Sequence, residues 1–137
     1  MSIHPAGIEV GASLPSVTHG PITRAELALY AANSGDLNPI HLDDHIARQN
    51  NLPGVVVHGM LSMAFLAQVL TNWTTQDRIR RFGGRFSAMA YPGDTVTCRG
   101  VIEAVATVDG QTLVDIGLTA ENQNGEALLT GKAQVAL

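Results

Sequence analysis

The sequence predicts a single α+β domain in which an antiparallel sheet wraps around one central, buried helix. The helix is indicated by residues 59–73, which are apolar on nearly every face and include no charged side chain. Several extended segments follow it. Asp109-Gly110 and Asn124-Gly125 separate the last three, and such dipeptides favour the tight turns that join antiparallel strands. The predicted strands of this half are 79–88, 95–105, 112–120 and 127–136.

Two short strands and a first helix are predicted ahead of the central helix. Residues 8–10 and 17–18 have the composition of short strands. Thr23 and Glu26 then form a T-x-x-E capping box, and apolar residues follow at spacings of three and four. We therefore expect an amphipathic helix that begins here and ends near Gly35.

A second, shorter helix is predicted to begin with Asp43 or Asp44 at its N-cap and to stop at Asn50. Between the two helices lies the segment SGDLNPIH, residues 34–41. Pro39 has no N–H and biases the residue before it towards extended geometry. This segment is therefore predicted to be a structured loop and not a regular helix.

Composition limits the classes of function. The chain has 137 residues, 45% of them hydrophobic and 15% charged, which is typical of one globular domain over residues 1–137. Its net charge of −4 does not favour a nucleic-acid partner. The longest nearly apolar run, 60–70, is too short to span a bilayer, so no membrane partner is expected. The first residues lack a signal-peptide pattern and the single Cys98 suits a reducing compartment, which together predict a cytoplasmic protein.

Asp36 and His41 are the first candidate catalytic pair. Because they lie in a loop, their five-residue spacing lets a carboxylate and an imidazole converge on one water molecule. Such a pair can move the protons needed to add water across a double bond or to remove it. Alternatively, Asp36 and Asn38 bind their own backbone in a turn and His41 is incidental. The residue types alone favour the turn.

His58 and Gly59 form a second candidate grouping at the start of the central helix. The first N–H groups of a helix lack intrahelical partners and lie at the positive end of its dipole, so they can hold a developing oxyanion. Gly59 also lets a ligand carbonyl approach closely. Alternatively, Gly59 only permits a tight entry into the helix, with His58 as a polar flank. Ser62 lies on the same face, although a serine in an apolar helix usually bonds back to a carbonyl.

A competing grouping is HLDDH, in which His41 and His45 have the i, i+4 spacing of metal ligands in helices. Pro39 lies two residues before His41, however, and the second helix is predicted to begin at Asp43 or Asp44. His41 would then lie before the helix and off its face. We therefore predict no metal site.

Together these residues resemble the MaoC-like family of (R)-specific enoyl-CoA hydratases and (3R)-hydroxyacyl-thioester dehydratases. Within that family the similarity is greatest to the catalytic subunit of the mycobacterial-type (3R)-hydroxyacyl-carrier-protein dehydratases. The similarity extends over essentially the whole chain. The motifs that carry it are Tyr30-Ala31, SGDLNPIH with Asp43, VHGM at 57–60, Arg85-Phe86 and YPGD at 91–94.

The resemblance implies a hot-dog fold with Asp36 and His41 as the catalytic dyad and with the Gly59 N–H polarising a thioester carbonyl. The implied reaction is reversible addition of water to a trans-2-enoyl thioester in fatty-acid or polyketide metabolism. The thioester itself acidifies the α-proton, so no metal or redox cofactor is expected, and the substrate carries CoA or phosphopantetheine. Substrate-binding roles are implied for Asn38, His58, Met60, Ser62 and Arg85.

The resemblance also implies a dimer whose two sheets join edge to edge, either a homodimer or a heterodimer with a related hot-dog subunit. Two alternatives stay open. One is a hot-dog thioesterase, although such enzymes use a carboxylate on the central helix and residues 59–73 contain none. The other is a non-catalytic partner subunit, against which the presence of Asp36 and His41 argues.

Overall fold

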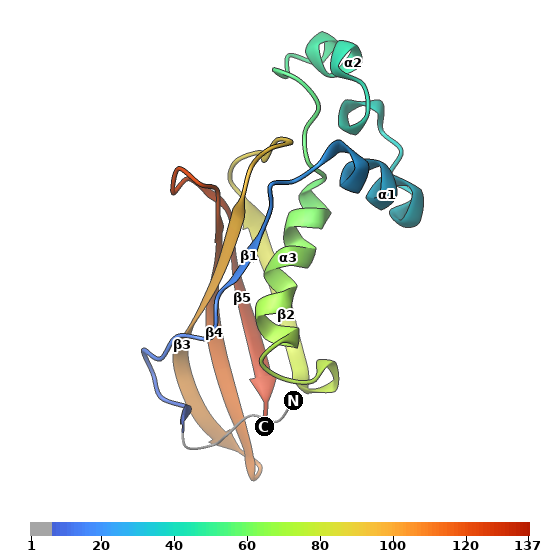
Figure 1. Cartoon of the computed structure of the whole chain (residues 1–137). Coiled ribbons are helices and arrows are strands. Elements are labelled where there is room, and N and C mark those ends of the chain that lie inside the picture. The colour runs from blue at the N-terminus through green and yellow to red at the C-terminus, as the bar shows by residue number, and fades with distance from the viewer. Residues whose placement is uncertain (1–6) are drawn as a thin grey trace.

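The structure is a computed structural model that describes residues 7–137. Its core is one five-stranded sheet in the order β1-β3-β4-β5-β2, in which every neighbouring pair is antiparallel. The sheet curves along one side of the helix α3 (Figure 1). The predicted α+β architecture is thereby confirmed. The strands are β1 Val17–His19, β2 Ile79–Phe86, β3 Val96–Val108, β4 Gln111–Glu121 and β5 Ala127–Ala136.

Turn chemistry fixes the register of the long strands. Asp109 and Gly110 both have positive φ, 51° and 76°, as the tight turn between β3 and β4 requires.

Residues 8–10 were predicted to be a strand, but they form none, and that prediction is wrong. The chain turns at Gly11, whose φ is 90°. Pairing with β3 is confined to residues 11–14, which contact it through three backbone hydrogen bonds and one bridge between Ser13 and Val101. Cys98 is buried in β3.

The central helix α3 spans Gly59–Thr71, two residues shorter than predicted. Its buried face packs on the sheet and consists of Ser62, Phe65, Leu66, Val69 and Leu70. The sheet covers only one side, so the opposite face, with Met60 and Gln68, is exposed in this chain. The sequence predicted a helix buried on nearly every face, and in the single chain α3 is buried on one face only. Among residues 7–137, no helix has the length and apolarity needed to cross a membrane.

The helix α1 (Arg24–Ser34) lies beside the start of α3, and α2 (Asp44–Gln49) lies farther from the sheet, at one end of the molecule (Figure 1). Thr23 and Glu26 form the predicted capping box of α1, and Asp43 is the N-cap of α2. Asp44 ties this region together. One of its oxygens accepts a hydrogen bond from Arg24 at 2.7 Å, and the other accepts from the Val55 N–H at 2.9 Å.

Candidate active site

The SGDLNPIH segment folds as two successive turns. Asp36 Oδ1 accepts a hydrogen bond from the Asn38 N–H at 3.3 Å, and Asn38 Oδ1 accepts from the Ile40 N–H at 3.2 Å. Pro39 then opens the short 3₁₀ helix η2 (Pro39–His41). The polar side chains of this loop thus bind their own backbone, as the turn interpretation expected.

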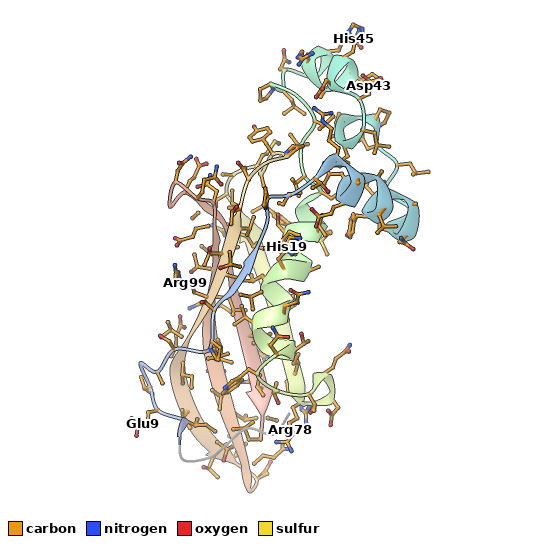
Figure 2. All side chains as sticks on the ribbon, viewed as in Figure 1. Glu9, His19, Asp43, His45, Arg78 and Arg99 are labelled. Atoms are coloured by element: carbon orange, nitrogen blue, oxygen red, sulfur yellow. The ribbon has the colours of Figure 1, made fainter. Side chains whose placement is uncertain are left out.

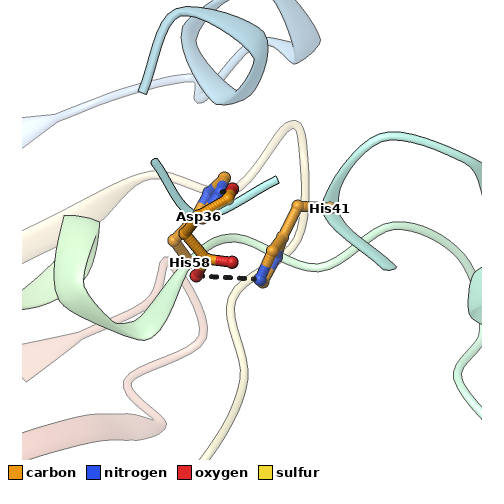
Figure 3. A group of neighbouring side chains, drawn as sticks. All are labelled: Asp36, His41 and His58. Carbon is orange, nitrogen blue, oxygen red and sulfur yellow. Dashed lines mark hydrogen bonds and ion pairs between the residues drawn. The ribbon is translucent and has the colours of Figure 1, made fainter. Parts of the chain in front are cut away.

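The same loop also brings Asp36 and His41 together. Asp36 Oδ2 lies 3.7 Å from His41 Nε2, a separation longer than a direct hydrogen bond (Figure 3). The turn uses Oδ1 and leaves Oδ2 facing the imidazole, so the backbone turn and the approach of Asp36 to His41 coexist in one loop. The carboxylate is half exposed while the ring is buried, so water can reach the carboxylate from solvent.

The hydrogen bonds of His41 define its neutral form. Nδ1 lies 2.7 Å from the carbonyl oxygen of Val56, and a carbonyl only accepts, so Nδ1 carries the proton. The lone pair is then on Nε2, which faces Asp36. His41 is held ready to take up a proton at that one nitrogen.

His58 lies behind this pair and is 1% exposed. Its ring stacks on that of His41, with centroids 3.7 Å apart, and meets the Tyr30 ring edge-on at 4.7 Å. His58 Nε2 lies 3.1 Å from the backbone carbonyl oxygen of Asp36 and donates to it. Burial lowers the pKa of His58 below the ordinary 6.5, and the hydrogen bond to Asp36 opposes that shift only in part.

A largely apolar cavity of about 220 Å³ opens beside His41. Gly59 and Ser62 line it from the start of α3, although they are far from the loop in sequence. The remaining walls come from Ile40, Val56, Val57, Phe86, Ala88, Met89, Ala90 and Leu128. The two predicted groupings, the loop pair and the helix start, therefore face one space.

Gly59 begins α3, and the side chain of the N-cap residue His58 makes no capping hydrogen bond there. The carbonyl of His58 accepts from the N–H groups of Leu61 and Ser62, and the Gly59 N–H precedes both. Such an N–H has no intrahelical acceptor. A Cβ on Gly59 would lie 3.2 Å from the Phe86 ring, so only glycine lets that ring pack against the helix start undisturbed.

Not every predicted residue reaches the cavity. Met60 is 58% exposed and Asn38 is exposed, and neither lines it. Arg85 lines a separate open depression of about 710 Å³ on β2 and β5, together with Arg81 and Lys132. That depression is larger, but none of its lining residues is a histidine or a carboxylate, so we place the chemistry in the smaller cavity.

The HLDDH residues serve separate purposes. Asp43 Oδ1 accepts from the His45 N–H as the N-cap of α2, while Asp44 binds Arg24 and Val55. The His45 side chain is exposed at the far end of the molecule (Figure 2). His41 and His45 do not act as a pair.

Asp36, His41 and His58 do place possible ligand atoms within 4.8 Å of one another. The two imidazoles are nearly parallel, however, at an angle of 20°. Lone pairs on imidazole nitrogens lie in the ring plane, so stacked rings direct them side by side and not towards one ion. The arrangement suits proton transfer better than metal coordination.

Some features of the site carry no sequence signal. The Val56 group that orients His41 is a backbone carbonyl, which every residue type has. The cavity walls from 86–90 and from Leu128 are apolar residues that look like ordinary core. Cys98 belongs to the hydrophobic core, and its burial raises the pKa of the thiol to about 11.

Known proteins share this arrangement of elements. A family model described as a MaoC-like domain matches residues 7–124. Fatty acid synthase subunit beta from Saccharomyces cerevisiae is 34% identical over 109 residues, which are 77% of this chain and 5% of that protein. The chain therefore spans about one twentieth of the length of this curated relative.

Solved structures show the same fold over nearly the whole chain. The R-hydratase PhaJ1 from Pseudomonas aeruginosa superposes with a TM-score of 0.80 at 26% identity, covering 95% of this chain and 82% of that one. The ChsH1-ChsH2 complex from Mycobacterium tuberculosis gives a TM-score of 0.80 at 23% identity, over 94% of this chain and 98% of that one.

Proposed function

Because the chain belongs to the MaoC-like dehydratase family, we propose that it is a hydro-lyase acting on trans-2-enoyl and (3R)-hydroxyacyl thioesters in fatty-acid or polyketide metabolism. CoA or the phosphopantetheine of a carrier protein would carry the acyl group. One observation carries the proposal: His41 and Gly59 line the same apolar cavity, with Asp36 3.7 Å from His41. Proton transfer and oxyanion stabilisation thus meet in one space.

The thioester carbonyl would lie against the start of α3. There the Gly59 N–H donates to the oxygen as it becomes enolate-like, and the helix dipole adds to this stabilisation. Removal of one such donor costs roughly 10²- to 10³-fold in rate in well-studied enzymes. The enoyl carbons then extend into the apolar cavity beside His41.

A water held between Asp36 Oδ2 and His41 Nε2 would attack C3. A new C–O bond forms at C3, the π electrons move towards the thioester carbonyl, and C2 takes a proton. The pair receives one proton from the water and supplies one to C2, so it returns to its starting state. Because the Val56 carbonyl holds the proton on Nδ1, His41 exchanges protons only through Nε2.

No metal or redox cofactor enters this scheme. The thioester carbonyl stabilises the negative charge that develops at C2, and the Gly59 N–H supplies the electrophilic contact. We propose that a chelator leaves the rate unchanged. A thioesterase mechanism is not favoured, since α3 offers no carboxylate to the cavity.

We propose that the chain works as a dimer, with a second copy or with a related hot-dog subunit. Among residues 7–137, strand β2 has a partner on one side only, and Met60, Phe86 and Met89 are large apolar residues exposed near the site. The similar fold of the ChsH1-ChsH2 complex supports assembly from two chains. The proposed location is the cytoplasm.

The direct test is hydration of crotonyl-CoA and longer 2-enoyl-CoAs, followed by loss of the enoyl absorbance and by chiral analysis of the product. Wild type is expected to form the (3R) alcohol, whereas Asp36→Asn and His41→Ala lose most of the rate. Release of free thiol in place of water addition would indicate a thioesterase. Inactivity on every chain length, alone and with candidate partner subunits, would overturn the proposal.

A further inference from the structure

We propose that His58 is a positioning residue, a neutral imidazole that fixes the backbone of Asp36 and the His41 ring relative to each other. This inference rests on the proposed function and deepens it. The resemblance implied a substrate-binding role for His58. The structure instead buries its side chain behind His41 and does not include it among the residues that line the cavity.

Asp36 lies on an exposed loop and needs to be held in place. Its N–H donates to Ser34 Oγ at 3.2 Å, its Oδ1 accepts from the Asn38 N–H, and its carbonyl accepts from His58 Nε2 at 3.1 Å. The first two bonds come from the loop itself. Of these three bonds, only the one from His58 ties Asp36 to the body of the domain, at the start of α3.

His41 is held by the same residue. The His58 ring covers one face of the His41 ring at 3.7 Å, while the Val56 carbonyl fixes its Nδ1 edge. Tyr30 of α1 packs edge-on against His58 and supports it from outside. His58 is therefore in contact with both members of the proposed dyad and sets the distance between them.

The unpartnered Nδ1 of His58 explains why the ring must be neutral. That atom is buried and has no hydrogen-bond partner among the described residues. Because Nε2 donates to a carbonyl, Nδ1 carries the lone pair in the neutral ring. A proton there would be a buried N–H without an acceptor, beside a second imidazole. Phenylalanine would fill the same space without this orphaned atom, but it could not donate to Asp36.

Two substitutions separate the two contacts. His58→Phe keeps a ring to stack on His41 and removes the donor to Asp36. His58→Gln keeps an N–H near the position of Nε2 and removes the stacked ring. Each is expected to lower kcat about 10- to 100-fold, the scale of a misplacement of about 1 Å, while KM stays within about twofold. His45→Gln, at an exposed histidine, is the matched control and should retain wild-type kcat.

A second measurement, on the wild-type protein, does not depend on activity or on the folding of a variant. Long-range ¹H–¹⁵N spectra of the imidazoles at pH 7 are expected to show His58 as the neutral Nε2–H tautomer and His41 as the Nδ1–H tautomer. A charged or Nδ1-protonated His58 would overturn the inference. The inference would also be overturned if folded His58→Phe and His58→Gln had a raised KM with the wild-type kcat, or if both kinetic constants matched wild type. An inactive wild type with the expected tautomers would count against the proposed function alone.

Discussion

The Nδ1 of His41 lies 2.7 Å from the carbonyl oxygen of Val56, and this contact decides which nitrogen of the ring can exchange a proton. Nε2 is left facing Asp36 at 3.7 Å, close enough for both groups to bind one water molecule. The geometry of the pair thus depends on a backbone group 15 residues away in sequence.

Asp36→Asn should abolish most activity while preserving the fold. The asparagine oxygen can still accept from the Asn38 N–H, so the turn survives, but the carboxylate of the proposed proton-transfer pair is lost. We expect kcat to fall about 10²- to 10⁴-fold, with the free energy of unfolding changed by at most about 0.5 kcal/mol. Asp109→Asn, at a positive-φ position that asparagine tolerates, is the control. Full activity in Asp36→Asn would contradict the assignment.

Gly59→Ala should impair catalysis although the backbone N–H remains. The new Cβ would lie 3.2 Å from the Phe86 ring, which must shift at the wall of the cavity. We expect kcat/KM for crotonyl-CoA to fall by about 10- to 100-fold. The control Gly83→Ala makes the same change where a Cβ meets no described residue within 4 Å. Equal activity of the two variants would show that substrate does not lie against the start of α3.

Ala88→Leu should shift the preference for acyl chain length. Ala88 lines the cavity, and a leucine there fills part of its 220 Å³. The ratio of kcat/KM for octenoyl-CoA to that for crotonyl-CoA is expected to fall, by roughly 10-fold or more if a single methylene clash is worth 1–3 kcal/mol. Ala106→Leu on the exposed half of β3 is the control. An unchanged ratio would place the acyl chain elsewhere.

The buried His58 should make stability depend on pH. Its pKa is lowered in the folded protein, so below pH 6.5 the unfolded chain binds a proton that the folded chain does not. Wild type should therefore lose stability relative to His58→Phe as pH falls below 6.5, by at most about 1.4 kcal/mol per pH unit. Tyr30, Asp36 and His41 are the titratable groups around it. Denaturant unfolding of both proteins between pH 7.5 and 5 checks this. A difference in free energy of unfolding that stayed constant with pH would contradict it.

The sequence predicted the elements whose signals are local. The capping box at Thr23 begins α1, the Asp109-Gly110 dipeptide forms the hairpin turn, and the apolar run from Gly59 forms α3. Residues 8–10 looked equally strand-like, but Gly11 turns the chain away before pairing can extend. Strand formation there depends on tertiary pairing, which composition does not specify.

The residues of the candidate site that carry polar, titratable side chains could be predicted from the sequence. The cavity that packing forms beside them could not. Asp36 and His41 stood out as a carboxylate and an imidazole in one loop, and the structure places them together. The cavity beside them is a property of the space between Ile40, Phe86 and Leu128, and each is an ordinary apolar residue in sequence. Arg85 faces another depression, since a strand directs successive side chains to opposite sides.

The ion pair between Arg24 and Asp44 affects the order in which parts of the molecule unfold. It is a largely exposed ion pair, which salt screens, and Ala47, the buried residue of α2, lies outside the main hydrophobic core. Most residues of that core lie on the sheet and on α3, and none lies on α2. Opening of α2 and its flanks can therefore precede global melting, as a separate cooperative unit. On heating at high ionic strength, turnover should vanish at a temperature where the amides of β4 are still protected from hydrogen exchange.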